Sequence, residues 1–222
     1  VTYLGFNGIT ENRPGGGGGG GPSLALVPGG GGASSGGSLE LTAGGDLSVG
    51  TITADGGNGK GGNLAGGGGG GAGGLVMLRA GGALASGTVS VKGGNGGGGA
   101  ASGGKGADGR VRWDAQTGSA PALAMDQTPT VHRGPAFMLG DPVFRVTDPR
   151  ITVIGTTGDR FDVSVENHGM AVSGPSVMIP SSGAAMFIPP LQQGLNHVCI
   201  LLFGGKPTTS EAEKCIDVAF LP

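Results

Sequence analysis

The chain has 222 residues, of which 55 are glycine, 13% are charged and two are cysteine, and its formal net charge is −2. This balance gives no basic surface for nucleic acid or an anionic membrane, and no apolar stretch approaches the ~20 residues that span a bilayer. The glycine is concentrated before about residue 118, and the rest has ordinary globular composition. The uneven distribution of glycine therefore predicts two domains. Nothing in the sequence has helical periodicity, which predicts an all-β fold.

The first segment, residues 1–13, begins with the apolar sequence VTYLGF. It lacks the basic start and continuous apolar core of a signal peptide. A chain that begins on Val is typical of a processed, secreted form, although a truncated chain would look the same. We expect VTYLGF to act as an added strand on a neighbouring subunit, which makes Val1, Tyr3, Leu4 and Phe6 candidate assembly contacts.

Residues 14–118 form a glycine-rich repeat. GGSLELTAGGDLSVGTITADGGNG begins at Gly36, and GGLVMLRAGGALASGTVSVKGGNG begins 37 residues later, at Gly73. Each copy predicts a short strand (39–43 or 75–80), a Gly-Gly turn, a second strand (51–54 or 88–91) and a long glycine excursion. A truncated copy begins at Asp108 and a degenerate one at Gly21. Since neither copy can bury its apolar positions alone, neighbouring copies should stack or pair.

The glycine excursions have two interpretations. Glycine is costly to order, so runs such as Gly15–Gly21 are either flexible or held by backbone hydrogen bonds to one another. The absence of Cβ permits the close approach that side-by-side three-residue helices need. The recurrence of the runs at matching places, with Pro, Ala, Asn and Ser as flanks, favours the ordered alternative.

Glycine runs interleaved with short strands over residues 14–112 resemble glycine-rich secreted surface proteins of bacteria. They are also similar to the polyglycine-II bundles of certain insect antifreeze proteins and phage tail-fibre adhesins. The resemblance implies a polyglycine-II-like bundle, but the antifreeze proteins keep a stricter Gly-X-X period than this chain.

Residues 119–141 are predicted to be a linker, and residues 142–222 an antiparallel β-sandwich. In the second range Phe161, Val163 and Val165 alternate with polar residues, and several further short apolar runs follow. FDVSVENHGMAVSGP resembles a strand–turn motif of bacterial Ig-like cell-surface modules such as the CARDB adhesion-related domains, which implies an Ig-like fold and no particular ligand.

Cys199 and Cys215 lie on predicted strands near the C-terminus. An even cysteine count in a low-charge chain suggests a disulfide and an oxidising compartment, and two free buried thiols are the alternative. The resemblance to Ig-like modules implies that the pair fastens the last two strands.

No catalytic, cofactor or metal site assembles from the sequence, so we expect no enzyme. The glycines around Lys60 and Lys105 lack the hydroxyl and the helix of a phosphate loop. Asp46, Asp55 and Asp108 do not keep the spacing of calcium repeats and are interpreted as turn residues. The spacing of the acidic residues leaves a glycosidase pair open, although most fall in turns.

Trp113 is interpreted as a core or interface residue rather than a sugar platform. The histidines are expected on the surface: His132, His168 and His197.

The leading hypothesis is a secreted, extracellular or cell-surface structural protein that associates with copies of itself as a filament, sheath or matrix subunit. Its partners would be itself and cell-surface or matrix components. The alternative is an adhesin or a tail-fibre-type receptor-binding protein, and ice binding is a third.

Overall fold

The computed structural model describes residues 16–23, 27–124, 126–139, 141–202 and 213–222. These residues fall into two compact units, 16–132 and 133–222, and each is described by itself. All regular elements within these described residues are strands, which confirms the expectation of an all-β fold. No helix in the described part has the length and apolar character needed to cross a membrane.

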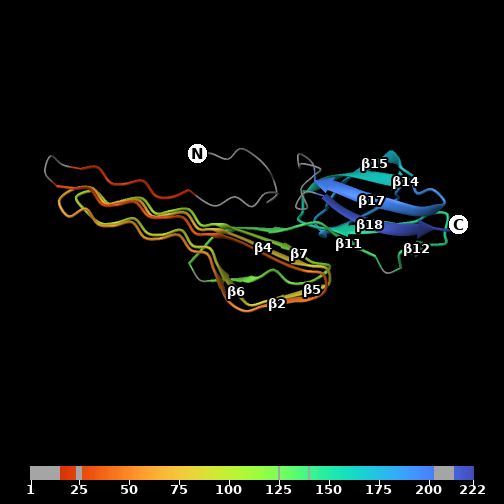
Figure 1. Cartoon of the computed structure of the whole chain (residues 1–222), viewed down its shortest axis with the longest axis horizontal. Coiled ribbons are helices and arrows are strands. Elements are labelled where there is room, and N and C mark those ends of the chain that lie inside the picture. The colour runs from red at the N-terminus through yellow and green to blue at the C-terminus, as the bar shows by residue number, and fades with distance from the viewer. Residues whose placement is uncertain (1–15, 24–26, 125, 140, 203–212) are drawn as a thin grey trace. The chain divides into compact units, whose positions relative to one another are not determined.

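The strands of the first unit form three small sheets (Figure 1), in which β1–β4–β7, β2–β5–β8 and β3–β6–β9 are parallel. The first sheet has the order β1 (Ser38–Ala43), β4 (Leu75–Ala80), β7 (Arg110–Asp114), β10 (Thr130–Arg133). The second is β2 (Leu47–Val49), β5 (Ala83–Ser86), β8 (Thr117–Gly118). The third is β3 (Ile52–Thr53), β6 (Thr88–Ser90), β9 (Ala122–Leu123).

The 37-residue spacing seen in the sequence is also the register of the first strand pair in each sheet, whereas the next pairs join residues 34 or 35 apart, such as Leu75 with Arg110. Ser38 pairs with Leu75, Leu47 with Leu84 and Ile52 with Val89. The chain therefore visits each sheet once per repeat, and we call one such passage a coil. The strand pairs β2–β5 and β5–β8 were not predicted, because segments of two to four residues carry little periodicity.

An apolar core lies between the three sheets of the first unit. Val76, Leu78, Val89 and Val111 are fully buried there, and Trp113 is 6% exposed. Neighbouring coils supply these residues jointly, as expected for repeats that cannot bury their apolar face singly. Trp113 is thus a core residue, as interpreted from the sequence.

The second unit contains two sheets that share one core (Figure 1). The smaller sheet has the order β11 (Ala136–Met138), β13 (Ile151–Ile154), β16 (Ala184–Phe187). The larger has the order β12 (Val143–Phe144), β18 (Glu213–Phe220), β17 (Gly194–Leu202), β14 (Arg160–Asn167), β15 (Met170–Met178). All pairs are antiparallel except β12–β18, which is parallel. This is a β-sandwich whose large sheet has one parallel pair.

Alternation along β14 follows the prediction. Phe161, Val163 and Val165 are buried, and the residues between them are exposed. The buried side chains meet Ile151 and Phe187 of the smaller sheet in the shared core.

The predicted linker, residues 119–141, carries β9, β10 and β11. Side chains of this segment hold it to the repeat. The Gln127 amide donates to the Val89 carbonyl at 2.9 Å and accepts from the Val91 N–H at 2.9 Å. The repeat structure therefore continues past residue 118.

Candidate functional site

The glycine excursions of the first unit run side by side beyond the strands (Figure 1). Hydrogen bonds between backbones join them, at donor–acceptor distances of 2.7 to 3.1 Å. We name these runs by their residues: 16–22, 29–36, 54–62, 66–74, 91–99 and 101–109. Together they form the glycine bundle.

Run 66–74 is the centre of the bundle. Each of its N–H groups donates to another run, and the acceptor changes with a period of three: first run 16–22, then 101–109, then 54–62. Its carbonyls accept from the remaining two runs: Gly66 and Gly69, for example, accept from Gly30 and Ala33. A backbone with three residues per turn points its N–H groups in three directions and its carbonyls in three others. The central run thus has five neighbours out of six.

Steric contacts explain why this run is nearly all glycine. A Cβ atom added at Gly68 would overlap the carbonyl oxygen of Gly31, and one added at Gly71 would overlap that of Ser34. Neighbouring backbones occupy the space of a side chain at these positions. At Gly19, by contrast, an added Cβ would meet nothing within 4 Å.

The sixth place around the central run, which we call the open position, has no neighbour among the described residues. The carbonyls that face it belong to Gly67, Gly70 and Gly73, and no described N–H donates to them. Their counterparts one coil earlier are filled: Gly30 and Ala33 accept from the N–H groups of Gly21 and Gly18. Run 16–22 therefore occupies, beside run 29–36, the place that is open beside run 66–74 one coil later.

Run 16–22 itself departs from the repeat. It lies antiparallel to runs 29–36 and 66–74, with hydrogen bonds such as Gly18 N–H to Ala33 and Gly69 N–H to Gly19. The repeat would have placed it parallel to run 54–62. Gly16, Gly17, Gly19 and Gly20 are exposed along its outer side.

Acidic and amide side chains connect successive coils. Asp46 accepts from the Ala83 N–H at 2.8 Å, Asp55 from Lys92 at 2.7 Å and Asn58 from Asn95 at 2.8 Å, each 37 residues away. The interpretation of these aspartates as local turn residues missed this role. An alignment of the two copies could have suggested it, because each acid stands one repeat before a backbone N–H that needs an acceptor.

Asp108 joins two further segments. Its carboxylate accepts from the Gly93 N–H at 2.8 Å and from the Thr128 N–H at 2.6 Å. These two hydrogen bonds, the first above all, lower the pKa of Asp108 below its ordinary value of 3.8. The oxygens that a calcium site would need are thus occupied by backbone donors.

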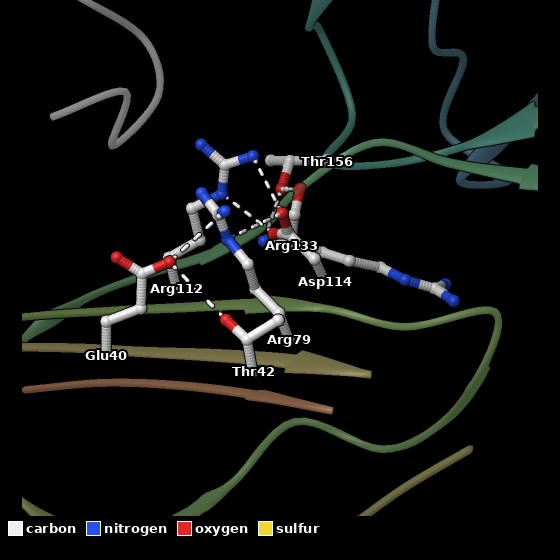
Figure 2. Close-up of polar contacts among 7 residues, drawn as sticks. All are labelled: Glu40, Thr42, Arg79, Arg112, Asp114, Arg133 and Thr156. Atoms are coloured by element: carbon white, nitrogen blue, oxygen red, sulfur yellow. Dashed lines mark hydrogen bonds and ion pairs between the residues drawn. The ribbon is translucent and has the colours of Figure 1, made fainter. Parts of the chain in front are cut away.

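A ladder of charges crosses the first sheet on the face opposite the core (Figure 2). Arg79 on β4 contacts Glu40 on β1 at 3.1 Å and Asp114 on β7 at 3.8 Å. Arg112 pairs with Asp114 through two hydrogen bonds of 2.8 and 3.0 Å and is 1% exposed. Two positive and two negative side chains compensate one another, so the ladder is a structural network and leaves no net charge for a ligand.

This ladder was not predicted from the sequence. The signal was present in RVRWDA, where Arg110, Arg112 and Asp114 alternate with apolar residues at the period of a strand. Figure 2 also draws Arg133 and Thr156 of the other unit, which exchange two hydrogen bonds of 2.8 and 2.9 Å. Burial lowers the pKa of Arg133.

The sandwich contains the predicted disulfide. Cys199 and Cys215 face each other on β17 and β18 and are bonded, so the alternative of two free thiols is wrong. His197 lies near both sulfurs, but disulfide sulfurs are not thiolates and do not hold a metal. The His197 ring nitrogen instead contacts Asp217 at 2.8 Å.

The histidines differ from the expectation in one case. His168 and His197 are exposed, as expected, but His132 is 3% exposed. It belongs to β10, which lies in the predicted linker, and one face of this strand is covered because the strand is part of a sheet. The candidate assembly contacts Val1, Tyr3, Leu4 and Phe6 lie outside the described residues.

Comparisons of the chain with protein-family models, with curated proteins and with solved structures found no match.

Proposed function

We propose that this chain is a structural, self-associating extracellular protein, a subunit of a filament, sheath or matrix. The open position carries the proposal. It presents the carbonyls of Gly67, Gly70 and Gly73 in a row, at the spacing that the bundle uses for its own contacts. A glycine run from a second copy fits along Gly67 and Gly70, and the row ends at Ala72, whose methyl lies on the same side of the run as position 69.

A contact between two bundles avoids the main cost of binding a glycine run, which is the loss of conformational entropy. Ordering a free glycine chain costs roughly 1–2 kcal/mol per residue, and a short row of hydrogen bonds, at about 1 kcal/mol net each, does not offset it. A run that is already held in its own bundle has met this cost during folding. Another copy of the chain is therefore a better partner than a flexible glycine-rich peptide.

Other observations support the same assignment. The three-residue period of hydrogen bonds supports a polyglycine-II-like bundle. Two sheets around one core support an Ig-like module. The disulfide also favours an oxidising, extracellular setting.

Electron microscopy and sedimentation velocity of matched variants test the proposal. In Gly69→Ala the new methyl enters the open position, and its nearest own-chain atoms are the N and O of Gly19 at 3.4 Å. A run lying there would collide with it, as run 16–22 would collide with a methyl at Gly32. Gly98→Ala is the control, because its Cβ meets nothing within 4 Å.

We expect wild type and Gly98→Ala to form assemblies, and Gly69→Ala to sediment as a smaller species with an unchanged melting temperature. Assembly of Gly69→Ala at the wild-type concentration would exclude the open position as the contact. A wild-type protein that stays a discrete particle and binds cells or glycans would contradict self-association and support the adhesin alternative.

A further inference from the structure

The sandwich has a groove between two strands that end their sheets. β15 is last in the five-stranded sheet and β16 is last in the three-stranded sheet, and the two strands are in contact. A shallow groove lies between them. A strand at the end of a sheet leaves backbone N–H and carbonyl groups unpaired, which makes it a template for a further strand.

The residues that line the groove are uncharged within the described part of the chain, and all of them except Ser176 have apolar side chains. Met178, Met186 and Ile188 stand along it with 64%, 59% and 53% of their surface exposed, and Val177 and Phe187 are buried beneath. Flexible methionine side chains adapt to a partner, so the groove suits an apolar, uncharged segment in extended conformation.

One end of the chain has this character. Among the segments longer than three residues outside the described ranges, 7–15 contains Glu11 and Arg13, and 203–212 contains Lys206 and Glu211. Residues 1–6, VTYLGF, carry no charged side chain, and their β-branched and aromatic residues favour a strand.

We propose that the groove binds residues 1–6 of a second copy as an added strand, a second contact that rests on the self-association proposed above. The added strand pairs with β16, because Pro175 removes a donor from β15. Side chains alternate along a strand, so Leu4 and Phe6 share one face. That face packs on Met178 and Met186.

The test uses the chain without residues 1–6 and a fluorescent peptide, VTYLGFNGI, labelled at its C-terminal end. Fluorescence anisotropy should show saturable binding. Met186→Glu should weaken it at least tenfold, because the carboxylate enters the apolar groove. Met170→Glu is the matched control: Met170 lies on β15, is 63% exposed and does not line the groove. Absence of binding, or equal binding by both variants, overturns the inference.

Sedimentation of the full chain separates this inference from the proposed function. Met186→Glu should give smaller species than wild type and Met170→Glu. Assembly that persists in Met186→Glu overturns the groove contact and leaves self-association standing. Peptide binding by a chain that is monomeric at all concentrations contradicts self-association and overturns the assignment of the segment to a second copy.

Discussion

At the scale of single residues, glycine has two different roles in this chain. At Gly68 and Gly71 neighbouring carbonyls fill the place of a Cβ, so the absence of a side chain is a packing requirement. At Gly19 that place is empty, and no contact within the described residues requires glycine. Composition alone does not distinguish the two roles, because both read as the same letter in a run.

The two roles predict opposite effects of a glycine-to-alanine substitution on stability, depending on its position. Gly71→Ala forces a methyl against the Ser34 carbonyl and should destabilise the first unit by about 3 kcal/mol or more, at the upper end of overpacking effects. Gly19→Ala should be neutral or stabilise by up to about 1 kcal/mol, because alanine restricts the unfolded chain. Urea unfolding of both variants measures the difference. Equal stability would mean that the runs are not packed against one another.

At the scale of elements, side-chain oxygens connect successive coils beyond the ends of the strands. Asp108 is the clearest case, since two backbone N–H groups from different segments donate to it. Its lowered pKa means that the folded state favours the charged carboxylate. The stabilisation is complete above the ordinary pKa of 3.8 and is lost as the pH falls below it, through the lowered pKa.

Asp108→Asn tests this linkage. The variant keeps the size of the side chain but loses the charge, and it should cost on the order of 1–2 kcal/mol at neutral pH after allowance for partial exposure. The difference from wild type should shrink as the pH falls below 3.8 and Asp108 becomes protonated through its lowered pKa. Urea titrations at several pH values measure it. The control is Asp148→Asn, whose exposed pair with Arg150 should contribute less than about 0.5 kcal/mol. A cost for Asp108→Asn that is independent of pH would contradict the account.

Much of the element structure was predictable from the sequence, and the exceptions have physical causes. The 37-residue repeat gave β1, β4 and β6 to within a residue, because their apolar positions recur. The strands of the supposed linker were missed because Gln127 fixes them through hydrogen bonds between residues far apart in the sequence. The reversed direction of run 16–22 is set by packing, which a glycine run does not encode.

At the scale of the whole molecule, the two units bury their apolar residues in different ways. The sandwich buries Phe161 and Ile200 between two sheets. The first unit has a small apolar core under its strands, and beyond it the glycine bundle is held by backbone hydrogen bonds. The central claim is that this bundle is an ordered structure, with run 66–74 at its centre.

Amide hydrogen exchange, read residue by residue by NMR, tests this claim most directly. Every N–H of residues 66–74 should be protected, because each donates to another run. In run 16–22 protection should follow a period of three: Gly18 and Gly21 protected, and Gly19 and Gly20, which donate to no described backbone acceptor, exchanging fast. Exchange of all these amides at the rate of an unfolded chain would contradict the bundle.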